Sequence, residues 1–384
     1  MNILVLNSGS SSLKAHLYAD GDEIRWKASA DWGRKPGFAH VRVNEDESEI
    51  EAAPGAVFDS VLRRLPAATE IGVVGHRVVH GGPAFRESVR IDAAVRSGIE
   101  KYCEFAPEHN WIALEGIGAA ERVFGPEMPQ IAVFDTAFHT TLPEPARIYP
   151  LPYELFGKGI WRYGFHGISH QYVSRRAAEM LGRPLCIVSC HLGNGASLAA
   201  VRDGVSVDTT MGFTPLDGIM MGTRSGAVDP GILIYLMRHR GLGADQMDRM
   251  LNRESGLKGV SGISGDMREI VTAMERGEAR AKLAFDAYVQ SLCRGIGAMA
   301  ASLGAMDAIV FTAGIGENSP PLRSSVCERL AFLGIELDPD RNGQVKDDAD
   351  IAAAGSRVRV LVVHTDEDRE IARECRRLTG SVRS

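Results

Sequence analysis

Two arginines in this chain lie among small residues, where a guanidinium group can reach an anion without obstruction. Arg77 belongs to the segment Gly75–Gly82 (GHRVVHGG), and Arg224 belongs to Met221–Gly226 (MGTRSG). The guanidinium fork keeps its charge at physiological pH and donates parallel hydrogen bonds that match carboxylates and phosphates. Either arginine alone could equally form a surface salt bridge. Their glycine-rich setting favours a site for an anion.

An aspartate follows directly on a short apolar run. Asp135 comes after Ile131–Phe134, which reads as a strand, and is followed by Thr136. Open α/β sheets bind ligands at the carboxyl ends of their strands, so this position favours a functional carboxylate. The alternative for Asp135 is an ordinary helix N-cap.

Histidines occur in two pairs spaced four residues apart, His76 with His80 and His166 with His170. The first pair lies in a strand-like run, where four residues span ~13 Å, too far for one metal ion. The second pair begins beside Gly167, at an expected helix start, and has no acidic residue between its members as a zinc protease motif requires. The spacing therefore does not indicate a zinc enzyme.

Glycine-rich loops are expected after three strand-like runs, at 7–12, 191–196 and 311–318. Glycine lets backbone N–H groups approach phosphate oxygens, because no Cβ atom stands in the way. The chain has no G-x-x-x-x-G-K-[ST] motif, and none of the three segments completes G-x-G-x-x-G, so neither a Walker loop nor a dinucleotide fold is indicated. Any one segment could be a plain turn, but the three together favour a divided phosphate-binding site.

The residues around these segments indicate a duplicated scaffold. Ile3–Leu6 and the alternating run Leu13–Tyr18 predict two strands joined by a Gly/Ser turn. The same design returns at 185–201, and the dipeptide Ser12-Leu13 recurs as Ser197-Leu198. A repeat separated by this length predicts two similar domains and not a solenoid, whose repeats are far shorter.

Elsewhere the pattern alternates between strands and helices, which predicts an α/β fold. Strands are expected at 71–79, 130–134, 308–312 and 358–363, and helices at 93–103, 114–123, 169–181, 230–238, 244–251, 267–276 and 279–303. Proline and glycine gather around 139–160, which suggests a crossover between domains.

The composition is that of a globular protein. The chain has 384 residues and a formal net charge of −6, which argues against broad binding to nucleic acid or to acidic membranes. The apolar start, Met1–Leu6, is too short for a signal peptide, and no segment approaches the length of a membrane span. The six cysteines are too sparse for a disulfide framework. We expect a cytoplasmic protein with reduced thiols.

Over almost its whole length the sequence resembles the acetate kinase family, within the acetate and sugar kinase/Hsc70/actin superfamily. The matching segments are Asn7–Lys14 (NSGSSSLK), His76–Gly82 (HRVVHGG), Phe134–His139 (FDTAFH), Arg162–Gly167 (RYGFHG), His191–Gly195 (HLGNG), Met211–Leu216 (MGFTPL), Met221–Gly226 (MGTRSG), Asp266–Arg268 (DMR), Phe311–Asn318 (FTAGIGEN) and Thr365–Glu367 (TDE). So many separate segments in one order make the resemblance specific.

The resemblance implies two duplicated actin-like, ribonuclease H-like α/β domains with an active-site cleft between them. We expect an N-terminal domain at 1–137, completed by a C-terminal helix at 368–384, and a nucleotide-binding domain at 138–367. The implied reaction is the reversible transfer of the γ-phosphoryl group of ATP to acetate, which gives acetyl phosphate and ADP. Mg²⁺, or Mn²⁺ in its place, is the implied cofactor, and a homodimer is the implied assembly.

The resemblance also implies roles for residues at matching positions. The expected catalytic residues are Arg77, Asp135, His166 and Arg224, with His166 stabilising the transition state. Asn7 and Glu367 are expected to hold the metal ion. Arg77, Val79, Phe165 and Pro215 are expected to bind the carboxylic acid. The expected nucleotide-binding residues are Lys14, His191, Leu192, Gly193, Asn194, Gly195, Asp266, Met267, Arg268, Gly314, Ile315, Gly316, Glu317 and Asn318.

Asp135 is not expected to act as a base, because a carboxylate substrate has no proton to lose at neutral pH. We expect it to orient an arginine or a metal-bound water.

Three residues depart from the family pattern. Glu108 replaces a leucine expected near the substrate's methyl group, so a hydroxylated acid is an alternative substrate. Ala227 replaces an aspartate next to the Arg224 segment, and Asp366 replaces an asparagine before Glu367. None of them removes a residue assigned to the chemistry.

Several alternatives to acetate kinase remain open at this point. Within the reaction class they are a propionate kinase, a butyrate kinase or a kinase of a hydroxylated acid. Outside it they are a nucleotide-binding sensor or chaperone without kinase activity, and a sugar kinase of the same fold.

Overall fold

The structure, a computed structural model, describes residues 1–380 except 10, 21, 36, 52 and 68, and describes no side chain at 34, 35, 107 or 108. The chain forms two compact units. Unit 1 consists of Met1–Phe138, Gly167–Ser169 and Asp366–Ser384, and unit 2 consists of His139–His166 and His170–Thr365. The C-terminal helix therefore belongs to the same unit as the N-terminal strands.

Unit 1 is built on a mixed sheet with the order β5-β4-β3-β2-β1-β6-β8-β7. Strands β1, β6 and β8 are parallel, and the remaining neighbours are antiparallel. The strands are β1 (Ile3–Ser8), β2 (Ser12–Tyr18), β3 (Ile24–Lys35), β4 (Phe38–Val43), β5 (Asp46–Glu51), β6 (Val73–Val78), β7 (Val89–Arg90) and β8 (Gln130–Phe134).

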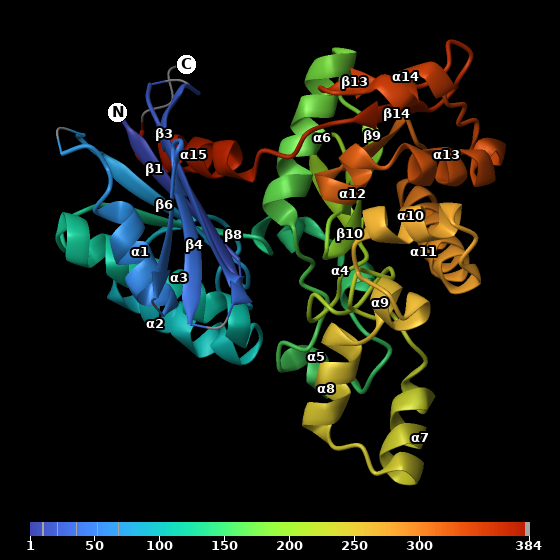
Figure 1. Cartoon of the computed structure of the whole chain (residues 1–384), viewed down its shortest axis with the longest axis horizontal. Coiled ribbons are helices and arrows are strands. Elements are labelled where there is room, and N and C mark those ends of the chain that lie inside the picture. Colours follow the sequence, from blue (N-terminus) through green and yellow to red (C-terminus); the bar gives the residue numbers. More distant parts are fainter. Residues whose placement is uncertain (10, 21, 36, 52, 68, 381–384) are drawn as a thin grey trace. The chain divides into compact units, whose positions relative to one another are not determined.

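Strand β1 is buried on both faces of this sheet. Its alternate residues divide between two apolar clusters: Leu4 and Leu6 belong to one, and Ile3 and Val5 belong to the other. The first cluster lies under α1 (Pro54–Leu62) and α3 (Pro107–Phe124) (Figure 1). Between these two helices the chain forms α2 (Ala93–Lys101). The second lies under α15 (Glu367–Leu378), so residues from both ends of the chain form this core.

Gly75 in β6 permits the close approach of α15. A Cβ atom built at this position would lie 2.6 Å from Sγ of Cys375 and 2.8 Å from Cγ2 of Ile371. Any larger residue would push the helix away from the strand that carries Arg77.

Unit 2 contains a second mixed sheet, with the order β11-β10-β9-β12-β14-β13. Here β9, β12 and β14 are parallel, and the other pairs are antiparallel. The strands are β9 (Cys186–Leu192), β10 (Ala196–Arg202), β11 (Val205–Thr209), β12 (Ala308–Thr312), β13 (Ala349–Asp350) and β14 (Arg359–Val362).

The helices of unit 2 include the long α11, which packs against β9, β10 and β11. Gly295 allows this contact, because a Cβ atom there would lie 2.6 Å from Cδ1 of Leu198. The helices are α4 (Glu144–Arg147), α5 (Tyr153–Gly157), α6 (Gly167–Leu181), α7 (Pro230–Arg240), α8 (Ala244–Arg253), α9 (Gly256–Ser261), α10 (Met267–Glu275), α11 (Ala279–Leu303), α12 (Ala313–Asn318), α13 (Pro320–Arg329) and α14 (Pro339–Gln344). The first residues of α6 belong to unit 1.

The predicted α/β class and the two similar sheets are confirmed, and every predicted strand and helix is present. Most ends differ by a few residues, but the helix predicted at 114–123 begins seven residues earlier, at Pro107. One expectation is wrong. The glycine-rich segment 311–318 is not a loop, because β12 ends at Thr312 and residues 313–318 form α12. Strands β3, β4 and β5, which extend the first sheet, were not predicted, and neither were β7, β11 and β13.

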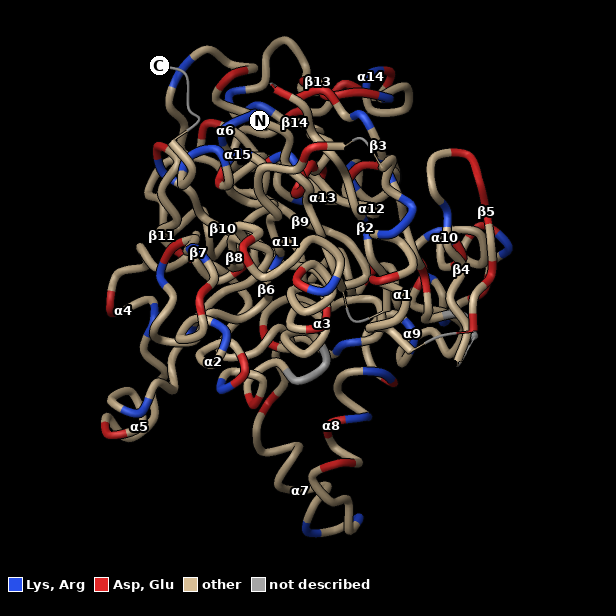
Figure 2. Tube along the Cα trace, turned by 90° about the vertical axis from the view of Figure 1, so that its left-hand side faces the viewer, with Lys and Arg blue, Asp and Glu red and all other residues tan. Residues whose placement is uncertain are grey.

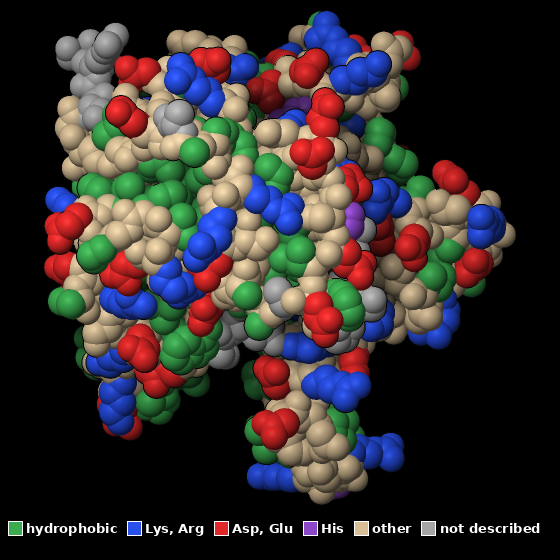
Figure 3. Space-filling view, turned by 60° about the vertical axis from the view of Figure 1, so that its left-hand side comes forward, with side chains coloured by type: hydrophobic (Ala, Val, Ile, Leu, Met, Phe, Trp, Pro, Cys, Tyr) green, Lys and Arg blue, Asp and Glu red, His purple; other side chains and the backbone are tan. Residues whose placement is uncertain are grey.

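The surface shown in Figure 3 carries Lys, Arg, Asp and Glu side chains interspersed, without a continuous basic patch on that face. Among the helices of the described residues, none is long and apolar enough to cross a membrane.

Candidate active site

In unit 1 the two expected anion-site residues form a buried ion pair. Nε and Nη2 of Arg77 donate to Oδ2 of Asp135 at 3.1 and 2.7 Å. The parallel strands β6 and β8 bring the two residues together, because Arg77 lies near the end of β6 and Asp135 directly follows β8. The backbone N–H of Asp135 donates to the carbonyl of Val78 at 2.9 Å, which extends the strand pairing to the aspartate.

This pair holds its charges in an environment that water barely reaches. The Asp135 side chain is 1% exposed and the Arg77 side chain 15%. Burial raises the pKa of Asp135 to about 6, against the opposing effect of the Arg77 guanidinium, and the charge of Glu367 adds to the rise. Burial acts to lower the pKa of Arg77, but the carboxylates of Asp135 and Glu367 outweigh it and hold that pKa above its ordinary value.

Within the described residues, the pair does not use all of its hydrogen-bonding capacity. Oδ1 of Asp135 is buried and has no hydrogen-bond partner among the described residues. Arg77 directs only two of its nitrogens at Asp135, so its Nη1 amino group is left as a donor for an anion. Buried polar atoms without partners are uncommon, and here they mark a place where a ligand would satisfy them.

The expected metal-binding residues also meet within unit 1. Nδ2 of Asn7, near the end of β1, donates to Oε2 of Glu367 at 3.0 Å and to Oδ1 of Asp368 at 2.7 Å. Asp368 is buried and lies 2.6 Å from Nδ1 of His16. Among the described residues no group of three or more His, Cys, Asp and Glu side chains is arranged as a complete metal site. Mg²⁺ needs no such cage, since it commonly binds through one or two carboxylates plus substrate phosphates.

The departure at Asp366 has a structural role. Asp366 is the N-cap of α15, and its carboxylate accepts a hydrogen bond from the backbone N–H of Arg369 at 3.0 Å. Burial raises the pKa of Asp366, and the charge of Asp368 adds to the rise. Lys14 lies in β2 opposite Asn7, so this expected nucleotide residue belongs to unit 1.

In unit 2, His166 lies at the N-cap of α6 with a left-handed backbone, at φ 56° and ψ 26°. This conformation is uncommon outside glycine and is found most often where function requires it. The imidazole ring stacks on that of His191, with 4.1 Å between ring centroids. Nδ1 of His166 lies 2.9 Å from Oγ of Ser197 in β10.

Arg224 lies close to the same ring. Its Nη1 donates to the carbonyl of Pro215 at 2.9 Å. A Cβ atom built on Gly195 would lie 3.2 Å from Nη1 of Arg224 and 3.5 Å from Cε1 of His166, so the backbone of Gly195 is a close neighbour of both side chains. The turn between β9 and β10 therefore meets the arginine and the histidine.

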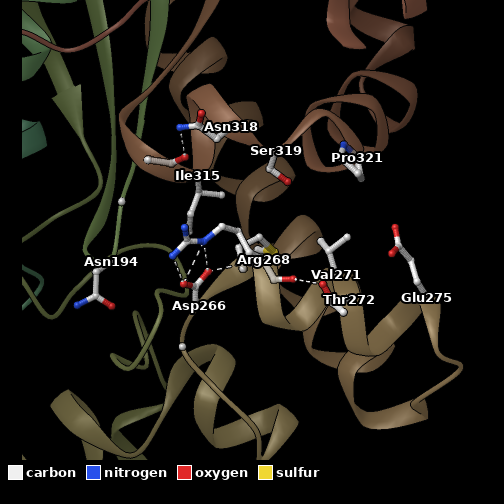
Figure 4. Close-up of a pocket in the computed structure, with 14 residues that line it drawn as sticks. Asn194, Asp266, Arg268, Val271, Thr272, Glu275, Ile315, Asn318, Ser319 and Pro321 are labelled. Atoms are coloured by element: carbon white, nitrogen blue, oxygen red, sulfur yellow. Dashed lines mark hydrogen bonds and ion pairs between the residues drawn. The ribbon is translucent and has the colours of Figure 1, made fainter. Parts of the chain in front are cut away.

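A pocket of about 940 Å³ opens beside this turn. It is lined by Gly193, Asn194, Gly265, Asp266, Met267, Arg268, Val271, Thr272, Glu275, Gly314, Ile315, Asn318, Ser319 and Pro321. In Figure 4 the side chain of Ile315 extends toward the Asp266–Arg268 pair, with Asn194 at one end of the pocket and Glu275 at the other. Its size and its mixed apolar and polar lining suit a nucleotide.

Eight of the expected nucleotide residues line this pocket: Gly193, Asn194, Asp266, Met267, Arg268, Gly314, Ile315 and Asn318. The pocket also includes Val271, Thr272 and Glu275, which the sequence did not single out. Their spacing places them on one face of α10 with Arg268, so a helical projection of that predicted helix could have found them.

Two residues hold α12 against the pocket. Oε1 of Glu317 accepts hydrogen bonds from the backbone N–H groups of Ala313 and Thr365 at 2.7 and 3.0 Å. The fully buried Arg323 donates to the carbonyls of Gly316 and Glu317 at 2.8 and 2.7 Å. Sequence reasoning missed Arg323, because an arginine in a polar segment reads as surface.

The remaining expected substrate residues are divided between the units. Val79 lies in unit 1, whereas Phe165 and Pro215 lie in unit 2. Val79 and Phe165 are almost completely buried. The side chain of Glu108 lies outside what the structure describes. Ala227 lines a separate polar pocket of about 390 Å³ that includes Arg162 and Arg294.

Comparison with known proteins gives one family. A sequence profile of the Acetokinase family matches residues 2–373. Two curated relatives, the acetate kinases of Gloeobacter violaceus and Trichormus variabilis, are 51% and 50% identical to this chain, and each alignment covers 98% of both proteins.

Solved structures give the same fold. The structure of acetate kinase from Porphyromonas gingivalis matches with a TM-score of 0.90 at 40% identity, covering 98% of this chain and 99% of that one. A propionate kinase from Francisella tularensis matches with a TM-score of 0.88 at 37% identity, covering 97% and 98%.

Proposed function

We propose that this chain, which belongs to the acetokinase family, is an acetate kinase that transfers the γ-phosphoryl group of ATP to acetate. In the transfer, a carboxylate oxygen of acetate forms a bond to the γ-phosphorus while the bond from that phosphorus to the β,γ-bridging oxygen breaks. The products are acetyl phosphate and ADP, and the reaction is reversible. It needs no proton transfer to or from the acid.

The buried Arg77–Asp135 pair is the observation that carries this proposal. An oxygen of the acid attacks a phosphoryl group that is itself negative, so the enzyme must hold two anions together. Asp135 fixes one edge of the Arg77 guanidinium, which leaves the rest of its fork to bind the acid's carboxylate. Asp135 acts here as a positioning residue, and its unpartnered Oδ1 is available to a metal-bound water.

Arg224 and His166 would bind the phosphoryl group during its transfer. Phosphoryl transfer depends mainly on alignment and on stabilising the charge spread over the equatorial oxygens. The guanidinium of Arg224 supplies positive charge, and the imidazole of His166 supplies a hydrogen-bond donor. Gly195, which is adjacent to both side chains, lets them approach the nucleotide-binding turn.

The pocket of unit 2 would bind ATP and ADP. Ile315, Val271 and Met267 offer apolar surface to the base, and the turn at Gly193–Gly195 offers backbone N–H groups to the phosphates. Lys14 of unit 1 would add a positive charge near the phosphates. His191, Leu192, Gly195, Gly316 and Glu317 do not line the pocket, and they would act by shaping the strand ends and α12 around it.

The oxygen atoms of Asn7 and Glu367 fit Mg²⁺, which prefers hard oxygen ligands and accepts Mn²⁺ as a substitute. When bound, the ion would supply positive charge to the phosphate oxygens. Nδ2 of Asn7 donates to Glu367 at 3.0 Å, so the two side chains lie together, and the amide would turn to offer Oδ1 to the ion.

Acetate is the proposed acceptor because the two curated relatives, at 51% and 50% identity, are acetate kinases. The similarity to a propionate kinase at 37% identity keeps propionate as the second candidate. Val79, Phe165 and Pro215 would contact the acid's methyl group.

A hydroxamate assay with Mg·ATP and a panel of acids tests the proposal. The panel contains acetate, propionate, butyrate, glycolate, lactate and no acid. If acetate gives product at a lower concentration than any other acid, the result supports an acetate kinase. If only a longer or hydroxylated acid gives product, that acid is the substrate and the proposed type of reaction still holds. ATP binding without product from any acid would contradict the proposed function. Arg77→Ala protein, purified in parallel, controls for contaminating kinases.

We also propose that the enzyme is a homodimer joined through α7. Ile232, Ile234, Tyr235 and Met237 on this helix are each about half exposed, and the helix has no buried residue. Figure 2 shows it free of charged residues except at its end. An apolar helix of this kind normally needs a partner.

Replacement of two of these residues, Ile234→Asp with Tyr235→Asp, should convert the dimer to a monomer in light-scattering chromatography. Lys158→Asp, an equally exposed charge change on another surface, is the matched control and should remain dimeric. A dimer that survives the double replacement would exclude α7 as the interface.

We expect the reaction to take place in the cytoplasm, where ATP is available. The predicted domains, 1–137 with 368–384 and 138–367, remain part of this proposal.

A further inference from the structure

A buried serine lies between two histidines in unit 2. Oγ of Ser197 is 2.9 Å from Nδ1 of His166 and 2.8 Å from Nε2 of His170. The other ring nitrogen of His170, Nδ1, lies 2.8 Å from Oγ of Ser189. Ser189, His170 and Ser197 are completely buried. These four residues form a continuous chain of hydrogen bonds from the core of the sheet to His166.

The number of protons in this chain limits its arrangements. Burial lowers the pKa of His170 well below its ordinary value, so the ring is neutral and carries one N–H. The hydroxyl of Ser197 has one proton, so it donates to one histidine and accepts from the other. The positions of the protons on the two imidazoles are therefore linked.

Only two arrangements satisfy these contacts. In the first, Nε2–H of His170 donates to Ser197, and the Ser197 hydroxyl donates to Nδ1 of His166. In the second, Ser197 donates to Nε2 of His170, and Nδ1–H of His166 donates to Ser197. A neutral His166 has its proton on Nε2 in the first arrangement and on Nδ1 in the second.

The surroundings of His166 favour the neutral ring. The groups around it include His191, stacked at 4.1 Å, His170 across Ser197, and Arg224 across Gly195. His139 packs on the far side of His170, with 5.7 Å between ring centroids. A second positive charge so close to Arg224 is electrostatically unfavourable. A neutral His166 can donate from Nε2 only if its Nδ1 accepts a hydrogen bond, as it does from Ser197 in the first arrangement.

We propose that Ser197 and His170 are positioning residues that keep the proton of neutral His166 on Nε2, where it donates to the phosphoryl group in transfer. The inference rests on the proposed kinase function and deepens it. At the buried end, Nε2–H of His170 donates to Oγ of Ser197. The Ser197 hydroxyl then donates its own proton to Nδ1 of His166, which leaves the proton of His166 on Nε2. His166 then acts as a donor without first taking a proton from solvent.

The first test compares two hydroxyl deletions. Ser197→Ala should lower kcat about 10- to 100-fold, because the ring loses its orientation and its fixed tautomer. The KM values for ATP and acetate should stay within about twofold, since ground-state contacts remain. Ser189→Ala removes a buried hydroxyl from the same chain but leaves the contact with His166, and it should retain most of kcat. Ser197→Thr keeps the hydroxyl and should recover much of the activity.

The dependence on pH separates positioning from a general packing defect. An imidazolium donates from Nε2 whatever lies at Nδ1, so the Ser197→Ala enzyme should recover relative to wild type as the pH falls from 8 to 6. The ratio of the two enzymes cancels effects common to both, such as protonation of Asp135. A ratio that does not change with pH, or equal losses in Ser197→Ala and Ser189→Ala, would overturn the proposal.

Nitrogen-15 NMR of the wild-type histidines tests the arrangement without turnover. The neutral His166 ring should carry its proton on Nε2, and a proton on Nδ1 would overturn the proposal. If the wild-type enzyme forms no acyl phosphate from any acid, the proposed function fails, while the NMR result still decides the hydrogen-bond arrangement.

Discussion

The two units are built on separate sheets of the same topology and use them differently. The order β3-β2-β1-β6-β8-β7 in unit 1 corresponds strand for strand to β11-β10-β9-β12-β14-β13 in unit 2, with the same parallel and antiparallel pairs. Unit 1 adds β4 and β5 at one edge. Its core strands are therefore a common scaffold on which different chemistry has been placed.

The difference lies at the ends of the parallel strands. In unit 1, β6 carries Arg77 and β8 is followed by Asp135, so charged side chains face one another. In unit 2, β12 leads into α12, and the turn before β10 is built from Gly193 and Gly195. One sheet offers fixed charges, and the other offers a pocket bordered by backbone. A small anion needs the first kind of site and a nucleotide the second.

Replacement of Arg77 should have the largest effect. Arg77→Ala should lower kcat/KM for acetate about 10³-fold, because the carboxylate loses its guanidinium and Asp135 is left as an uncompensated buried charge. ADP affinity, a property of unit 2, should stay within about twofold. Arg90→Ala, an exposed arginine in the same sheet, is the matched control. Near-normal activity in Arg77→Ala would show that the reaction does not need the charged site of unit 1.

Asp135→Asn should lower kcat about 10²-fold, since the amide cannot fix the guanidinium as a carboxylate does. Although this variant should lose activity, it should be more stable than the wild-type protein at pH 7. Burial raises the pKa of Asp135 to about 6, so the wild-type protein loses stability as the pH rises from about 4 to about 6, where the unfolded chain ionises first. Asparagine does not ionise, so the variant does not lose this stability as the pH rises.

Urea unfolding at pH 4, 5, 6 and 7 measures this contribution. The free energy of unfolding of Asp135→Asn, relative to wild type, should be highest at pH 7 and should decline as the pH falls below 6. A variant that is less stable than wild type at pH 7 would show that the ion pair outweighs the cost of burying the carboxylate.

Arg323→Met should weaken the support of α12 beside the pocket of unit 2. The buried guanidinium donates to carbonyls of Gly316, Glu317 and Asn342, which the thioether cannot replace. We expect a loss of about 3 kcal/mol in the free energy of unfolding and roughly tenfold weaker ADP binding, equivalent to about 1.4 kcal/mol. Calorimetry measures both, with the exposed Arg329→Met on the same helix as control. Unchanged ADP binding would show that α12 needs no support from Arg323.

Asp366→Asn should have the smallest effect. Asparagine also caps helix N-termini, so the stability should change by less than about 0.5 kcal/mol at pH 7. The loss of a negative charge beside Glu367 should slightly raise the Mg²⁺ concentration needed for half-maximal activity, which a titration would detect. A large loss of stability would show that the charge, and not the cap, is what α15 requires.

The sequence predicted most of the scaffold because apolar periodicity follows burial directly. It missed β3, β4 and β5, although Trp26, Ala28 and Ala30 alternate with polar residues as a half-buried strand requires. The glycines of the segment 311–318 predict a loop, whereas the structure has a helix from residue 313. Glu317 and Arg323, which hold it as a helix, act through contacts that local sequence does not reveal.

The site was predicted mainly from motifs, and its supporting residues were not. The recurring Ser-Leu dipeptide indicated the duplication, yet the two copies do not occupy equivalent positions. Leu13 pairs at the tip of its hairpin, whereas Leu198 lies two residues beyond the first paired residue, Ala196. Ser197 gave no chemical signal of its own, because its significance depends on two histidines from α6 and its N-cap.

The position of α15 constrains the order in which this protein can be made. Ile3, Val5 and Val73 emerge from the ribosome early, but Ile371 and Ala372, which cover them, are more than 290 residues later in the chain. Synthesis at ~5–20 residues per second leaves that apolar face uncovered for tens of seconds. The first sheet to be translated is therefore the last to be completed, because its second apolar face waits for α15, which ends at Leu378.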